Sequence, residues 1–306
     1  MEPLPLVVLL GPTASGKTDL AVALAQRFSG EIISADAFAV YRGLNIATAK
    51  PTTEQRQGIP HHLIDILEPE ERCDASRWLA LADTCLTEIH ARQHLPIVAG
   101  GTPLYTKALL EGLSAGAPRD ATLRATLQQR YRDEGSAALF AELARVDPDY
   151  AQKHHPNDER RIVRALEVYG LTGRPYSSFH TTAGRRRNDL RPLLLGLAWE
   201  RDLLYRRIDA RVEALFSAGL VDEVRRLRPR LSPEAAQAVG CKEIIAFFDG
   251  LYDEAEARRL VARNSRHLAK HQMTWYRGWQ DIVWIPGNAT DLLAQANERI
   301  ARFLGE

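Results

Sequence analysis

The 306-residue sequence has little cysteine, no long apolar run and no excess of charge of either sign. Its cysteines, Cys73, Cys85 and Cys241, lie far apart without CxxC spacing, which argues against a disulfide framework and a zinc site. The longest apolar runs fall well short of the roughly 18 residues that cross a bilayer, so we expect no membrane span. The first residues contain no basic leader and no cleavage site, so we expect no secretory signal and a cytoplasmic location.

The charge balance, Lys+Arg 40 against Asp+Glu 39, argues at first against a nucleic-acid partner, because phosphate binding relies on excess Lys and Arg. Two segments depart from it. Residues 257–280 carry a local charge of +6, and residues 153–191 a charge of +5. Arg259, Arg263, Arg266 and Lys270 share the spacing of one helix face, close to aromatic residues. Either run alone is typical of a solvated surface, but the two together favour a polyanion larger than a nucleotide.

Short runs rich in leucine or β-branched residues predict buried strands at 6–10, 31–35, 63–67, 96–99, 193–197 and 282–285. Helical patterns lie between them and cover 18–28, 76–92 and 102–110, then 201–217, 220–227 and 255–275. Between the fourth and fifth strands the helical stretches 120–134, 136–145 and 157–169 follow one another. We therefore predict an α/β fold: a P-loop NTPase-like parallel sheet with flanking helices in residues 1–118 and 190–306, plus a helical insertion domain in residues 119–189.

A phosphate-binding motif follows the first predicted strand and precedes a helix. It matches GxxxxGK[ST] and consists of Gly11, Pro12, Thr13, Ala14, Ser15, Gly16, Lys17 and Thr18. Successive backbone N–H groups and the helix N-terminus face an anion, Lys17 adds a point charge, and Thr18 offers its hydroxyl to Mg²⁺. We therefore predict a diphosphate ligand, with Mg²⁺ as cofactor held by Thr18. The loop does not indicate what the phosphates are attached to.

One carboxylate is expected beside this loop. Asp36 follows the strand at 31–35, and the carboxyl ends of parallel strands share one crevice, so it suits a general base or metal ligand. The alternative is a helix N-cap or surface residue. The strand at 96–99 ends in Gly100-Gly101-Thr102 and lacks the acid with which a P-loop ATPase holds Mg²⁺; Asp65 could supply it but ends no clear apolar run. This weakens a motor or GTPase interpretation.

Further motifs accompany the P-loop along nearly the whole chain. They lie at residues 33–36, 40–51, 61–65, 100–105, 155–158, 161, 164–168, 239–243 and 270–277. Together they resemble the bacterial tRNA dimethylallyltransferase (tRNA isopentenyltransferase) family. The resemblance implies an enzyme in which N6 of adenosine 37, the adenosine just 3′ of the anticodon, attacks dimethylallyl diphosphate. The products are N6-isopentenyladenosine and diphosphate.

The resemblance also implies roles for individual residues. The catalytic set would be Asp36, Thr102, Lys17 and Arg207. Asp36 would accept a proton from the adenine amine or orient it, and Thr102 would lie near that amine or the diphosphate. Arg207 would reach the diphosphate, with Arg211 as a weaker candidate. From the residues alone, a surface salt bridge is the alternative for Arg207.

The partner would be a tRNA anticodon stem-loop whose adenine flips into the P-loop tunnel while the insertion domain clamps the stem. By resemblance, the tRNA-binding residues are Asp36, Ala37, Phe38, Ala39, Thr102, Arg124, Arg160, Arg161, Ile162, Val163, Arg164, Gln237, Ala238, Val239, Gly240, Cys241, Lys242, His271, Trp275 and Arg277. Ala37 and Ala39 replace polar residues, Ala47 replaces Gly, and Cys241 replaces a Tyr whose stacking cannot be carried over.

Two alternatives differ in class from this prenyltransferase. A P-loop small-molecule kinase shares the start of the fold but has no need for a basic face with aromatic residues. A non-catalytic RNA-binding module is disfavoured by the intact Lys17, Thr18 and Asp36. We expect dimethylallyl diphosphate and tRNA as the partners and a monomer as the active species.

Overall fold

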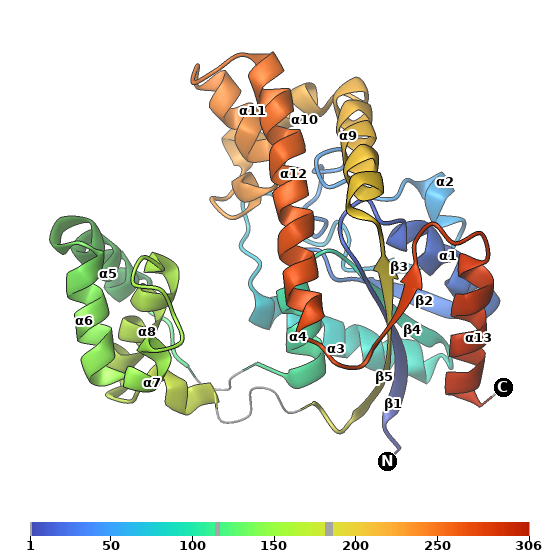
Figure 1. Ribbon diagram of the computed structural model, residues 1–306, viewed down its shortest axis with the longest axis horizontal. Helices are drawn as coiled ribbons and strands as arrows, with labels where there is room; N and C mark the ends of the chain where they lie inside the picture. Colours follow the sequence, from blue (N-terminus) through green and yellow to red (C-terminus); the bar gives the residue numbers. More distant parts are fainter. Residues whose placement is uncertain (1, 114–116, 181–185, 306) are drawn as a thin grey trace. The chain divides into compact units, whose positions relative to one another are not determined.

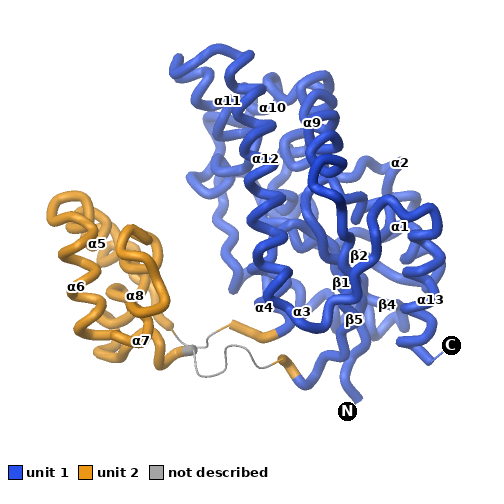
Figure 2. Tube along the Cα trace, in the orientation of Figure 1, with its two compact units in different colours: residues 1–110, 188–306 blue, residues 111–187 orange. Residues whose placement is uncertain are grey.

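A computed structural model describes residues 2–113, 117–180 and 186–305. The chain forms two compact units, residues 1–110 with 188–306 and residues 111–187 (Figure 2). The inserted unit thus begins at Glu111 and ends at Arg187, whereas the sequence placed it at 119–189. Each unit has a hydrophobic core of its own.

Unit 1 is built on six parallel strands in the order β3-β2-β4-β1-β5-β6 (Figure 1). They are β1 (Leu4–Leu10), β2 (Gly30–Ser34), β3 (His61–His62), β4 (Leu95–Ala99), β5 (Leu190–Ala198) and β6 (Ile282–Pro286). Because all strands run the same way, the loops that follow β1, β2, β4 and β5 leave at one edge of the sheet. Residues from distant parts of the sequence meet there.

Helices cover both faces of this sheet (Figure 1). Val7 and Leu9 of β1 pack with α1 (Lys17–Arg27) and α13 (Leu292–Leu304), whereas Leu6, Val8 and Leu10 pack with α3 (Ala75–Ala91) and α4 (Pro103–Glu111). Successive strand residues point to opposite faces, so a strand covered on both sides is apolar throughout. This is why β1 reads as an unbroken apolar run.

The remaining helices of unit 1 are α2 (Thr53–Arg56), α9 (Arg201–Ser217), α10 (Leu220–Leu227), α11 (Cys241–Phe248) and α12 (Glu254–Arg277). Short 3₁₀ turns lie at Arg228–Arg230 and Ala235–Gln237. The long helix α12 packs against α9 and α11. Its N-terminus is capped by Asp253, whose carboxylate accepts from Glu256 N at 2.8 Å. Its buried residues are Ala257, Val261, Ala269, Gln272 and Tyr276, which follow one helical face.

Unit 2 is helical. It contains α5 (Ala121–Glu134), α6 (Ser136–Val146), α7 (Pro148–Ala151), α8 (Glu159–Thr172) and a 3₁₀ segment at Tyr176–His180. Its core includes Leu127, Leu139, Leu143, Ile162 and Leu166. The expected helices at 120–134, 136–145 and 157–169 therefore form with small shifts at their ends.

The expected strand at 63–67 is wrong. Strand β3 is only His61–His62, because Leu63 (φ 61°) and Asp65 (φ 55°) adopt left-handed backbone conformations that cannot continue a strand. Leu67 keeps a single bridge to Tyr41. The segment thus bends instead of pairing.

A buried carboxylate shapes the neighbouring motif at 40–51. Glu223, on α10, accepts from the backbone N–H groups of Asn45, Ile46 and Ala47 at 2.8–3.0 Å. Lys50 is buried and donates to Tyr41 O. These residues of the family motif therefore hold the loop in shape.

Candidate active site

The P-loop encloses the ammonium group of Lys17. Gly16 has a left-handed conformation (φ 90°) that lets the loop turn into α1. Lys17 Nζ donates to Gly11 O at 2.8 Å and to Pro12 O at 2.7 Å. The side chain is thereby fixed within the loop, where a bound phosphate would meet it.

Lys17 and Arg211 form a cationic pair without an acid to neutralise it. Burial, and then the nearby Arg211, lower the pKa of Lys17 to about 7, while Asp36 opposes the shift. Burial also lowers the pKa of Arg211, again opposed by Asp36. Among the described residues Arg211 makes no hydrogen bond or ion pair, and Lys17 makes no ion pair. An anion bound here would relieve both unfavourable charges.

Gly100 brings the loops after β2 and β4 into contact. A Cβ on Gly100 would lie 2.2 Å from the carbonyl carbon of Ala35, so only glycine permits this approach. Thr102 N then donates to Ala35 O at 3.0 Å, and Ala37 N donates to Thr102 Oγ1 at 2.9 Å. Thr102 and Asp36 are therefore neighbours, as predicted.

Asp36 has the capping role considered as the alternative for it, and this uses only one of its oxygens. Its Oδ1 accepts from Phe38 N at 2.9 Å and Ala39 N at 3.2 Å, which caps the turn after β2. Its Oδ2 has no hydrogen bond within the described part of the chain. One oxygen thus fixes the carboxylate and the other remains available for chemistry.

Arg207 supports the P-loop from outside. Its Nε donates to Ala14 O at 2.8 Å, and its guanidinium lies 4.4 Å from the ring centre of Trp199. Trp199 Nε1 in turn donates to Ser15 O at 3.1 Å. Arg207 forms no salt bridge among the described residues, and a Cβ on Gly16 would lie 3.8 Å from its guanidinium. Both Arg207 and Arg211 therefore lie close to the P-loop, and Arg211 is the arginine whose charge lowers the pKa of Lys17.

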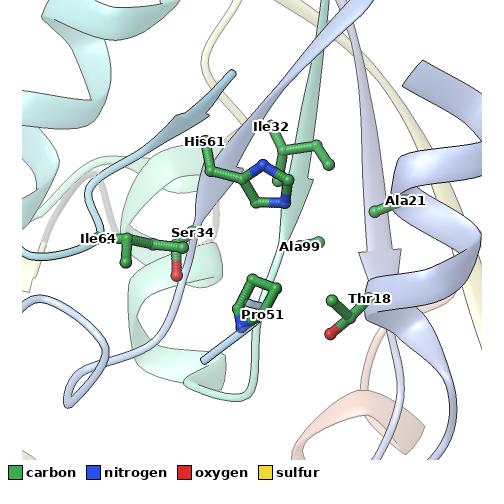
Figure 3. Close-up of a pocket in the computed structure, with 8 residues that line it drawn as sticks. All are labelled: Thr18, Ala21, Ile32, Ser34, Pro51, His61, Ile64 and Ala99. Atoms are coloured by element: carbon green, nitrogen blue, oxygen red, sulfur yellow. The ribbon is translucent and has the colours of Figure 1, made fainter. Parts of the chain in front are cut away.

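A cavity of about 50 Å³ lies beside Thr18 (Figure 3). It is lined by Thr18, Ala21, Ile32, Ser34, Pro51, His61, Ile64 and Ala99. The lining contains no carboxylate, since Ala99 ends β4 and Asp65 is paired with Lys50 at 2.6 Å. The structure therefore excludes Asp65 as a free metal ligand. Within the described residues there is no cluster of three or more acidic, His or Cys side chains suited to a metal.

Sequence reasoning placed Gln272 within a motif but gave it no role. Its Oε1 accepts from Thr13 N at 2.8 Å, and its Nε2 donates to Gly101 O at 2.6 Å. Thr13 N is therefore not free to bind a phosphate. The sequence signal that could have identified Gln272 is its position on the apolar face of an amphipathic helix, where a polar residue is unusual.

The predicted tRNA-binding residues of unit 1 differ in accessibility. Gln237, Lys242, His271 and Arg277 are exposed; Asp36, Ala37, Phe38, Thr102, Val239 and Trp275 are half-buried; Ala39, Ala238, Gly240 and Cys241 are buried. Lys107 Nζ lies 6.0 Å from the Trp275 ring centre, and the His271 ring packs edge-on against it. Burial raises the pKa of Cys241 to about 12, so its thiol is an inert core group.

In unit 2, Arg160 and Arg161 are exposed, whereas Ile162 and Val163 belong to the core. Arg124 and Arg164 both bind the buried Glu167, with the closest N–O distances 2.6 and 2.8 Å. Arg160 and Arg161 are thus the accessible cations of the predicted set. Arg185, counted in the basic segment, lies outside the described residues.

The basic face of α12 is less charged in space than in sequence. Arg258 and Arg266 pair with Glu213 and Asp209 on α9, and Arg259 pairs with Glu256 on α12 itself, each at 2.6 Å. Arg263, Lys270 and Arg277 form no ion pair among the described residues. The local charge of +6 is therefore an overestimate, and the unpaired cations include those near the C-terminal end of the helix.

A parallel sheet with a P-loop after β1 and an acid after β2 defines a P-loop protein that handles a phosphorylated ligand. Models of the families described as IPP transferase and Isopentenyl transferase match residues 39–279 and 4–66. Similar proteins include tRNA dimethylallyltransferase 1 of Trichlorobacter lovleyi, 46% identical over 95% of this chain and 97% of the relative. The tRNA dimethylallyltransferase of Symbiobacterium thermophilum is 45% identical over 99% and 96%. The chain therefore belongs to the IPP transferase family.

Solved structures agree with this assignment. The tRNA isopentenylpyrophosphate transferase of Bacillus halodurans is 39% identical, with a TM-score of 0.73 over 99% of this chain and 97% of that one. A eukaryotic dimethylallyltransferase described as acting on tRNA is 27% identical, with a TM-score of 0.81 over 96% and 77%. In the part of the chain that the structure describes, no helix is both long and apolar enough to span a membrane.

Proposed function

We propose that this chain transfers the dimethylallyl group of dimethylallyl diphosphate to N6 of adenosine 37 in tRNA. Its membership of the IPP transferase family supports the reaction class. The observation that carries the proposal is the proximity of Lys17 and Arg211, two cations that make no ion pair among the described residues, to Asp36, whose Oδ2 has no hydrogen bond there. A substrate with an anionic leaving group beside a weakly acidic amine matches these groups.

The proposed step balances within this site. The N6 atom forms a bond to the allylic carbon, the bond from that carbon to the diphosphate oxygen breaks, and diphosphate leaves with the electron pair. The N6 proton passes to Asp36 Oδ2. Lys17, Arg211 and the free P-loop N–H groups stabilise the negative charge that grows on the leaving group. Thr102, bonded to Ala37 N, keeps the Asp36 turn in place.

We propose Mg²⁺ as the cofactor, held on the protein side by the exposed Thr18 hydroxyl. Thr18 would supply one neutral oxygen, and because the cavity beside it contains no carboxylate, the remaining ligands of Mg²⁺ would be diphosphate oxygens and water. Mg²⁺ commonly takes one or two protein ligands and completes its shell with substrate phosphates and water. When bound it would neutralise part of the diphosphate charge.

For the RNA we propose that the exposed His271, Arg277 and Lys242 contact the anticodon loop and that Arg160 and Arg161 bind the stem backbone. The helical unit would clamp the stem while the adenine flips out. We propose a monomer that works in the cytoplasm, where unmodified tRNA is available.

The test is incubation with Mg²⁺, labelled dimethylallyl diphosphate and unmodified tRNA. We expect label in N6-isopentenyladenosine at position 37, and none in a tRNA that carries guanosine there. A protein that leaves the RNA unlabelled but phosphorylates a small metabolite with ATP would contradict the proposal in favour of the kinase alternative.

A further inference from the structure

Gln272 joins three segments that are far apart in the sequence. The side chain is 1% exposed and lies on α12. Its amide contacts Thr13 of the P-loop, 259 positions away, and Gly101 after β4, 171 positions away. Both contacts are to backbone groups, so they fix the course of the two loops.

The same amide lies beside Asp36. A Cβ on Gly101 would sit 2.9 Å from Gln272 Nε2 and 3.5 Å from Asp36 Oδ2. The amide and the free carboxylate oxygen therefore border one small space, which Gly101 leaves open. Gln272 thus adjoins both the loop that would hold the diphosphate and the group that would take the proton.

Gln272 also lies next to the surface proposed to bind RNA. His271 precedes it and is exposed, and Trp275 follows less than one turn later. All three belong to one continuous helix of 24 residues. A contact that shifts or orders the exposed side of α12 must also act on the buried amide, because the helix backbone connects them.

We propose that Gln272 is a positioning residue that couples RNA binding on α12 to diphosphate binding in the P-loop. The inference rests on the proposed function, since it takes RNA as the ligand of α12. RNA on α12 orders the helix, Gln272 then holds Thr13 and Gly101 in the geometry that accepts diphosphate, and the diphosphate loop gains affinity. Linkage requires the converse: diphosphate strengthens RNA binding by the same factor.

The experiment measures binding of inorganic diphosphate with Mg²⁺ by calorimetry, with and without an unmodified anticodon stem-loop. In the wild type we expect the RNA to tighten diphosphate binding about fivefold or more. Gln272→Met keeps the length of the side chain but removes both hydrogen bonds, and it should bring this ratio to about 1. It should also weaken diphosphate binding alone by about tenfold, because the loops at Thr13 and Gly101 would then have to be ordered when the diphosphate binds.

Two further variants separate positioning from general stability. Gln295→Met removes a comparable amide on α13 that bonds only Asp291, and it should leave the coupling unchanged. Gln272→Glu retains an acceptor for Thr13 N but loses the donor to Gly101 O, so the coupling should fall even if Gln272→Met fails to fold. The proposal is overturned if the wild type shows no coupling, or if folded Gln272→Met or Gln272→Glu retains it. Diphosphate binding without prenylated tRNA would instead contradict the proposed function, because the diphosphate measurement needs no turnover.

Discussion

The P-loop and the helical unit treat buried charge in opposite ways. At the P-loop, Lys17 and Arg211 are withdrawn from water without a paired acid among the described residues. In the helical unit, Glu167 is fully buried, but it accepts from Arg124, Arg164 and the Asp120 backbone N–H at 2.6–2.8 Å. A buried charge that is paired with opposite charges serves the scaffold, whereas a buried charge without an ion pair is a candidate for binding a ligand. The comparison therefore separates binding residues from structural ones where the sequence shows only charged side chains.

The largest effect is expected at the P-loop, where Lys17 has no ion pair among the described residues. Lys17→Ala should weaken diphosphate binding and lower kcat/KM about a thousandfold, or ~4 kcal/mol of transition-state stabilisation, because it removes a desolvated cation from the leaving group. Steady-state kinetics and calorimetry check this. If Lys17→Ala bound diphosphate with unchanged affinity, Lys17 would not be a diphosphate-binding residue, and the contrast with Glu167 would not hold.

Asp36→Ala should lower the turnover rate without weakening diphosphate binding. Turnover should fall about 10²- to 10³-fold, the usual range for loss of a general base. Diphosphate affinity should stay equal or increase, because a negative charge near the anion is lost. Single-turnover rates and binding constants of the same preparation give the answer, with Asp36→Asn as the control that keeps the acceptor for the turn. Equal losses of binding in the Asp36 and Lys17 variants would refute this division of roles.

A second buried carboxylate with several partners, Glu31, should make the stability of the fold depend on pH in acid. Glu31 is buried, and its hydrogen bonds with Arg92, His62 and His94 lower its pKa to about 2 despite the opposing effect of burial. A folded-state pKa below the usual 4.5 stabilises the fold above that pH, and the contribution is lost as pH falls from 4.5 toward 2. The loss should reach about 3 kcal/mol. Urea unfolding between pH 6 and 3 should show it, and Glu31→Gln should flatten the curve.

The smallest effect is expected in the helical unit. Glu167→Gln should destabilise unit 2 by about 2 kcal/mol, less than the usual loss of a buried ion pair because Arg124 is 38% exposed and can hydrate. Hydrogen exchange should increase in α5 and α8, while diphosphate affinity stays the same. Glu134→Gln, at an exposed pair, is the matched control and should leave the stability of unit 2 nearly unchanged.

Local patterns predicted most of the sheet and the helices around it, because burial on both faces of a parallel sheet leaves an apolar run that needs no long-range information. The segment at 63–67 misled because its apolar residues bend through left-handed conformations fixed by contacts with Lys50 and Ala39. The short helix α11 was not predicted. Its N-terminus is capped by Glu243, whose carboxylate accepts from Gly240 N within the same turn.

The site was predicted as a set of residues but not as a geometry. The P-loop, Asp36 and Thr102 follow from motif and strand position. The contact of Arg207 with Ala14 and the influence of Arg211 on Lys17 depend on how α9 lies against the P-loop, and the contacts of Gln272 depend on packing between segments at opposite ends of the chain. The paired arginines of α12 show the same limit, because their acids lie mostly on other parts of the fold.

The bond between Thr13 and Gln272 also bears on when the protein becomes active during its synthesis. The first four strands and α1 can form from the early part of the chain, yet α12 is made much later. Contacts between such distant residues form slowly, since a long loop must close before they can stabilise anything. A nascent chain would thus carry a complete phosphate motif long before it could organise a working site. Recovery of activity on refolding should follow the slowest folding phase.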